Sequence, residues 1–145
     1  MVDSRSNTNL AIVYTDPNQA SPSESAIVSF KGTTGGFEWA DNVTGLHETD
    51  TVSQREALQF IEGLDYEHMT AIGHSKGGNK AMYVGILSDR VDRVLSLDGQ
   101  GFSSDFFKKY QAEICARGGN ITNISVNMDY VNALLAQFPN SRQLY

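Results

Sequence analysis

The stretch from residue 69 to residue 87, MTAIGHSKGGNKAMYVGIL, decides the fold. Its first four residues are mostly apolar and are typical of a buried strand, whereas residues 79–87 are typical of a helix. Between them, Gly-x-Ser-x-Gly predicts a sharp, strained turn that exposes the hydroxyl of Ser75 at the top of a sheet. Side chains at Gly73 and Gly77 would collide with the neighbouring strand or helix. The motif consists of common residues and, taken alone, also arises by chance. The predicted strand before it and the predicted helix after it favour a nucleophile elbow.

The rest of the chain alternates between predicted strands and helices. Strands are expected at residues 9–15, 26–30, 69–72, 94–97 and 121–126, and helices at residues 53–64, 79–87, 106–114 and 130–137, with a single helical turn at 37–41. This alternation predicts an α/β fold with a mainly parallel sheet and right-handed crossovers. Reactive groups of such sheets gather at the carboxyl ends of the strands. Four residues fall just after predicted strands and should lie on one rim there: Thr33, Ser75, Asp98 and Asp129. Of these, Thr33, Ser75 and Asp129 are expected to converge in one pocket.

Composition narrows the classes of function. The 145 residues predict one domain, 1–145, with 40% hydrophobic and 19% charged residues, as in globular proteins. A net charge of −6 argues against a nucleic-acid partner. Cys115 is the only cysteine, so an internal disulfide is impossible, and we expect a cytoplasmic protein without a signal peptide or transmembrane segment. We expect no cofactor and no metal site, because the histidines are scattered and no acidic cluster has ligand spacing.

Three separate motifs resemble one known family. Residues 73–81 look like the elbow of lipase-like α/β-hydrolases, and most of all like a largely uncharacterised bacterial group related to the class 3 lipases. Phe30-Lys31-Gly32-Thr33 and Leu97-Asp98-Gly99-Gln100-Gly101-Phe102 fit the same group in the same order. The resemblance implies a three-layer α/β-hydrolase fold whose C-terminal part is missing from this chain. It also implies serine esterase or lipase activity on acyl esters, with an acyl ester or lipid as substrate.

The resemblance assigns roles to individual residues. Ser75 is the expected nucleophile, which would attack an ester carbonyl and form an acyl-enzyme. The backbone N–H of Lys76 is the expected first oxyanion donor. In class 3 lipases the second donor comes from the hydroxyl residue after the Arg-Gly pair, and Thr33 after Lys31-Gly32 matches it. On its own, the glycine-rich segment 32–36 is equally compatible with an ordinary connection.

Two aspartates compete for the triad acid. In α/β-hydrolases the chain order is Ser, then Asp or Glu, then His, and both Asp98 and Asp129 follow strands after Ser75. The segment 127–131 resembles the class 3 lipase acid segment, which favours Asp129. Asp98 is then expected to shape the turn beside the site, with its carboxylate bonded to backbone N–H groups.

The chain departs from the family's Ser–Asp–His order at the triad histidine, because no histidine follows Asp129. We expect His74 to pack under the turn and His68 to lie at the amino end of its strand. His47 can approach the rim, although this breaks the usual order. The favoured interpretation is that the chain stops before the family's final segment, so this fragment is weak or inactive. It would then expose an apolar patch and form a homodimer. The alternative is a non-catalytic module that binds an acyl or small apolar ligand, or a protein partner.

Overall fold

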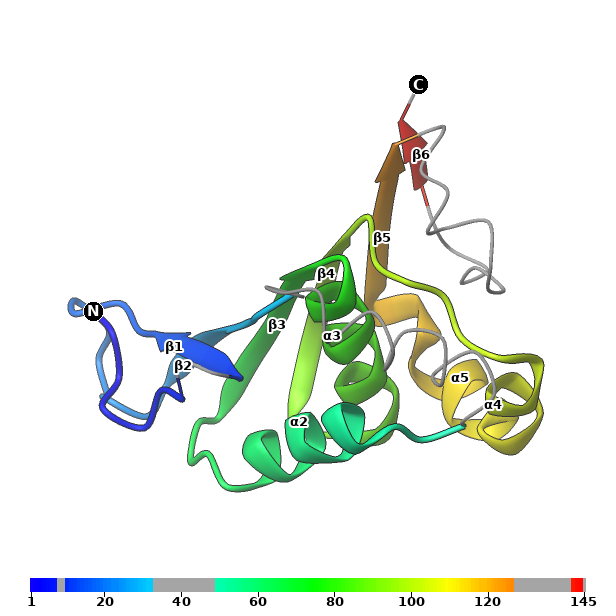
Figure 1. Cartoon of the computed structure of the whole chain (residues 1–145). Helices are drawn as coiled ribbons and strands as arrows, with labels where there is room; N and C mark the ends of the chain where they lie inside the picture. The colour runs from blue at the N-terminus through cyan, green and yellow to red at the C-terminus, as the bar shows by residue number, and fades with distance from the viewer. Residues whose placement is uncertain (8–9, 33–48, 127–141, 145) are drawn as a thin grey trace.

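The computed structural model describes residues 1–7, 10–32, 49–126 and 142–144 of the chain. From β2 to β5, strands alternate with helical segments, as the sequence predicts, whereas β6 was not predicted (Figure 1). The strands are Ala11–Tyr14 (β1), Ser25–Phe30 (β2), His68–His74 (β3), Val91–Leu97 (β4), Ile121–Val126 (β5) and Arg142–Leu144 (β6). The helices are Val52–Glu62 (α2), Lys76–Leu87 (α3), Ser104–Lys109 (α4) and Gln111–Arg117 (α5), followed by the short 3-10 helix Gly118–Asn120 (η1).

The strands form one six-stranded sheet in the order β1-β2-β3-β4-β5-β6. β1 is antiparallel to β2, and every other neighbouring pair is parallel. The predicted α/β class with a mainly parallel sheet is therefore confirmed. Because β2 to β5 point the same way, their carboxyl ends lie at one edge, which we call the carboxyl edge. The opposite edge, where these strands begin, is the amino edge.

The helices of the described residues cover one face of this sheet. α3 packs on β3 and β4, and both α2 and α5 contact α3 (Figure 1). The strand order explains this arrangement, because each crossover moves one strand in the same direction, and right-handed crossovers then place every helix on the same side. The described ranges thus form two layers, and the third layer that we expected is not found within them.

The core lies between the sheet and α3. Val28, Ala71 and Val94 point from β2, β3 and β4 toward the helices and are buried, as are Met82 and Ile86 of α3. Because side chains alternate along a strand, their neighbours point to the other face. Four apolar residues there are more than a third exposed: Tyr14, Ile27, Leu95 and Leu97. We call this side the open sheet face.

The expected helix over residues 106–114 is wrong as a single element. The chain forms two short helices, α4 and α5, which meet at Tyr110. Tyr110 leaves helical geometry with φ −109° and ψ 28°, and its hydroxyl donates a hydrogen bond to Asp50 at 2.8 Å. A tertiary contact thus accompanies the break in a segment whose local spacing favours one helix. The predicted helix at 130–137 and the turn at 37–41 lie outside the described residues.

Candidate active site

Ser75 forms the junction between β3 and α3 by itself. β3 ends at His74 and α3 begins at Lys76, three residues before the predicted start. Ser75 has φ 54° and ψ −121°. A non-glycine residue in such a region costs on the order of 1–3 kcal/mol and persists only where its surroundings hold it. The predicted sharp, strained turn is therefore confirmed.

Backbone hydrogen bonds hold this strained residue from two sides. The N–H of Ser75 donates to the carbonyl oxygen of Leu97 at the end of β4, at 3.0 Å. Its own carbonyl oxygen accepts from the N–H of Asn79 at 3.1 Å, within α3, and from the N–H of Gln100 at 3.3 Å, in the connection after β4. The conformation of Ser75 thus depends on the β4–α4 connection as well as on its own helix.

The glycines on either side of Ser75 are required by close backbone contacts. A Cβ on Gly73 would lie 2.3 Å from the carbonyl carbon and oxygen of Gly77. A Cβ on Gly77 would lie 2.3 Å from the carbonyl oxygen of Phe30, at the end of β2. Both contacts are far shorter than van der Waals separation, so the collisions expected at these two positions are confirmed.

The start of the glycine-rich segment lies against the elbow. A Cβ on Gly32 would lie 3.0 Å from the carbonyl oxygen of His74 and 4.0 Å from the backbone nitrogen of Gly77. Lys76 begins the twelve-residue helix α3, and the first turn of this helix contains no acidic side chain. The N-terminus of such a helix carries partial positive charge that favours an anion. Gly32 therefore brings the chain to this positive end directly before Thr33.

Asp98 lies beside Ser75 at the carboxyl edge. It follows β4 directly with φ 46°, and its N–H donates to the carbonyl oxygen of Ile124 in β5 at 2.8 Å. This confirms that Asp98 occupies a turn next to the elbow, while its carboxylate contacts stay a prediction. Thr33, His47 and Asp129 lie outside the described residues, so the shared pocket of Thr33, Ser75 and Asp129 also stays a prediction.

The expected packing of His74 under the turn is wrong. His74 is exposed, because the alternation of β3 puts it on the face opposite to α3, as a cross-strand neighbour of the exposed Leu97. His68 lies at the amino edge as predicted, where its Nδ1 is 3.1 Å from a carboxylate oxygen of Asp92. Neither of these two histidines is hydrogen-bonded to Ser75 in the described part of the chain.

Sequence reasoning missed a buried amide pair behind the elbow. The side chain of Asn79 accepts a hydrogen bond from Gln54 Nε2 at 2.7 Å, and its Nδ2 donates to the carbonyl oxygens of Gln100 and Gly101, both at 3.0 Å. Asn79 and Gln54 are both less than a tenth exposed. The available signal was a polar residue in the first turn of a helix that is otherwise buried.

A second missed feature is a carboxylate shared by three donors. Asp50 accepts hydrogen bonds from Tyr83 and Tyr110, both at 2.8 Å, and from Lys109. Burial alone would raise the pKa of Asp50, but the hydrogen bonds from Lys109, Tyr110 and Tyr83 outweigh it and lower that pKa. Burial, together with the bond to Asp50, raises the pKa of Tyr83. The cluster joins the approach to α2, the middle of α3 and the α4–α5 junction.

The Asp50 cluster predicts acid-sensitive stability. Because the folded pKa of Asp50 lies below its unfolded value of about 3.9, its contribution is present above that pH and is lost as the pH falls below it. Asp50→Asn should lower the free energy of unfolding by about 1 kcal/mol at neutral pH, since solvent screens part of the ion pair. The difference should shrink below about pH 3, as measured by urea unfolding. Asp89→Asn, which changes an exposed carboxylate, is the control. If Asp50→Asn lowered the free energy of unfolding equally at neutral and at acidic pH, ionisation of Asp50 would not be coupled to stability.

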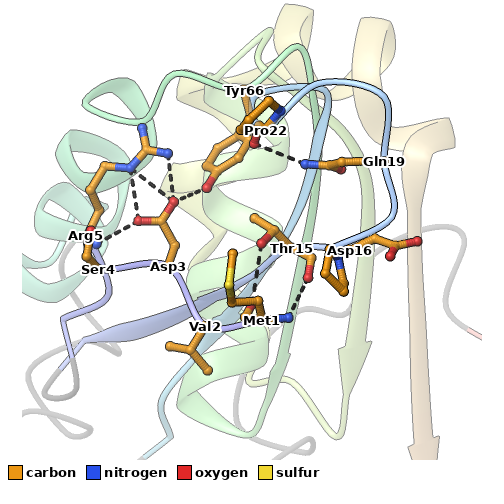
Figure 2. A pocket seen from close by; sticks show the side chains of 11 residues that line it. Met1, Val2, Asp3, Ser4, Arg5, Thr15, Asp16, Gln19, Pro22 and Tyr66 are labelled. Carbon is orange, nitrogen blue, oxygen red and sulfur yellow. Dashed lines mark hydrogen bonds and ion pairs between the residues drawn. The ribbon is translucent and has the colours of Figure 1, made fainter.

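A cavity of about 450 Å³ lies near the N-terminus (Figure 2). It is at the amino edge, because its lining includes Pro22, before β2, and Tyr66, before β3. On one wall Arg5 pairs with Asp3 at 2.7 Å and lies over the ring of Tyr66, 4.6 Å from its centroid. Tyr66 also donates a hydrogen bond to Asp3. The bond from Arg5 holds the pKa of Asp3 well below its usual range. The charged groups of this wall therefore satisfy one another, and the cluster ties the N-terminal segment to the start of β3.

The described residues contain no group of three or more histidine, cysteine, aspartate or glutamate side chains that could hold a metal ion. No helix among them is long and apolar enough to cross a membrane.

Residues 4–126 match the family model described as Mbeg1-like, which includes the elbow, Asp98 and all of the sheet from β1 to β5. No curated protein and no solved structure matches the chain.

Proposed function

The chain belongs to the Mbeg1-like family, and we propose that it is a serine hydrolase of the esterase and lipase type, acting on acyl esters through an acyl-enzyme on Ser75. The observation that carries the proposal is the backbone of Ser75, with φ 54° and ψ −121° between a parallel strand and a helix. Strained non-glycine residues cluster at functional sites, and a strand–turn–helix junction of this kind exposes the serine hydroxyl at the top of the sheet, which supports the proposal. The α/β sheet is compatible with an α/β-hydrolase fold.

In the proposed mechanism, Ser75 Oγ attacks the carbonyl carbon of the ester and gives up its proton to a base. The carbonyl oxygen becomes negative and accepts a hydrogen bond from the backbone N–H of Lys76 at the positive end of α3. Thr33 supplies the second donor. The intermediate then expels the alcohol, which takes a proton, and water later releases the acid from Ser75.

Asp129 is the proposed triad acid, and Asp98 takes that role if Asp129 lies away from Ser75. Asp98 already occupies the carboxyl edge next to the elbow, which supports it as the alternative. The base is unassigned among the described residues. A homodimer and a cytoplasmic location are further proposals drawn from the sequence.

A non-catalytic binding module is the second candidate. It is favoured by the two described histidines, neither of which is hydrogen-bonded to Ser75. In that function Ser75 would be inert, and its elbow would be only a structural feature of a domain that binds an acyl group, a small apolar ligand or a protein.

Acylation of Ser75 distinguishes the two candidates. We expect incubation with excess p-nitrophenyl acetate to acetylate Ser75 about tenfold faster than any other serine, since an oxyanion hole alone retains a large part of the rate enhancement. Peptide mass spectrometry measures the adduct even where turnover is slow.

Ser75→Ala should remove the adduct without moving it elsewhere, and Ser104→Ala, at an exposed serine of α4, should leave it unchanged. A Ser75 that reacts no faster than Ser104 would reject the hydrolase and support the binding module.

A further inference from the structure

A buried amide joins the segments that surround the elbow. Asn79, in the first turn of α3, is 8% exposed and makes three side-chain hydrogen bonds. Both of its Nδ2 hydrogens are used, one by the carbonyl oxygen of Gln100 and one by that of Gly101. Its Oδ1 accepts from Gln54 in α2. The side chain of Asn79 thus connects two successive peptide groups after β4 with its own helix, α3, and with α2.

The segment after β4 that is hydrogen-bonded to Asn79 is also hydrogen-bonded to Ser75. The N–H of Gln100 donates to the carbonyl oxygen of Ser75, and the carbonyl of the same residue accepts from Asn79. Gln100 is therefore bonded on one side to the strained residue and on the other to the buried amide. A strained backbone persists only where its surroundings over-determine it. Asn79 supplies one of those restraints through Gln100.

The partners of Asn79 require an asparagine. Two carbonyl oxygens need two donors, and the Nε2 of Gln54 needs an acceptor, which a single primary amide provides. An aspartate has nearly the same shape but would place a carboxylate against two carbonyl oxygens. A leucine would leave all three partners unsatisfied, at about 1–3 kcal/mol for each buried group.

Gln54 is itself held in place. Its Oε1 accepts from the N–H of Thr51 at 2.8 Å, and its own N–H donates to Thr51 Oγ1, which closes a capping box at the start of α2. The network therefore reaches from the elbow to the N-terminal cap of α2.

We propose that Asn79 is a positioning residue, which holds the elbow of Ser75 in its strained conformation through the peptides of Gln100 and Gly101. Its effect on acylation rests on the proposed function, whereas its effect on the backbone does not. Asn79 has no direct part in the reaction, and it acts on Ser75 by restricting the connection after β4.

The test compares Asn79→Asp with Ser88→Ala. Ser88 is buried at the other end of α3, where its hydroxyl bonds to Glu62, so this variant controls for loss of a buried hydrogen bond far from Ser75. The first readout is amide hydrogen exchange at Gln100, which should accelerate about tenfold or more in Asn79→Asp and remain near wild type in Ser88→Ala. The second is the rate of Ser75 acetylation, which should fall about tenfold in Asn79→Asp only.

Gln54→Glu gives a milder change if Asn79→Asp fails to fold. A glutamate keeps the acceptor for Thr51 and loses the donor to Asn79, so both readouts should move in the same direction by a smaller factor. Gln100 exchange that is unchanged in a folded variant, or changed equally in Ser88→Ala, would overturn the inference. If wild-type Ser75 is not selectively acetylated, the proposed function fails, and Gln100 exchange alone then decides the role of Asn79.

Discussion

Gly77→Ala is expected to lower the free energy of unfolding by about 3 kcal/mol or more, because the added Cβ meets backbone that cannot move aside. The atom in its way is the carbonyl oxygen of Phe30, at 2.3 Å, in a central strand of the sheet. Relief of this contact requires β2 and the first turn of α3 to separate. Gly73→Ala should behave alike, since its Cβ would meet the carbonyl group of Gly77 at 2.3 Å and the backbone nitrogen of Gly78 at 2.7 Å.

Gly119→Ala is the matched control for these two variants. A Cβ on Gly119 has no heavy atom within 4 Å, so the same chemical change should alter stability by about 0.5 kcal/mol or less. Urea unfolding at equilibrium measures all three differences. The close approach of β2 and α3 would be refuted by a Gly77→Ala protein as stable as the Gly119→Ala protein.

The second large effect concerns turnover. The 145-residue chain should hydrolyse a short-chain activated ester at close to the uncatalysed rate, and Ser75→Ala should change that rate little. Members of a catalytic triad act as a unit, so the loss of one costs on the order of 10⁴-fold in turnover. Neither His68 nor His74 is hydrogen-bonded to Ser75. Single acetylation events on Ser75 remain detectable by mass spectrometry under these conditions.

Brisk turnover by this chain would contradict the expectation that none of its histidines acts as the base. Loss of that turnover in His47→Ala would identify His47 as the base, in a chain order that α/β-hydrolases do not normally use. His68→Ala is the control, because His68 lies at the amino edge next to Asp92 and should not affect hydrolysis.

Local sequence determined the elbow and the sheet. Apolar runs of strand length and helical spacing predict β3 and α3, because both patterns are local, and the glycines on either side of Ser75 mark the sharp turn between them. The parallel order followed from the alternation of elements. Asp98 was placed correctly beside the elbow for the same reason, since it directly follows a strand.

Only the tertiary structure decided which side chains meet. Asn79 bonds to residues 21, 22 and 25 positions away, and Asp50 to residues 33, 59 and 60 positions away. No periodicity reports such partners. His74 was misplaced because one residue of strand register decides which face it takes, and the helix over 106–114 was misjudged because Tyr110 interrupts it while bonding to Asp50. Secondary structure is favoured by neighbours in sequence, whereas buried polar partners are chosen by the need to satisfy each donor and acceptor in the folded chain.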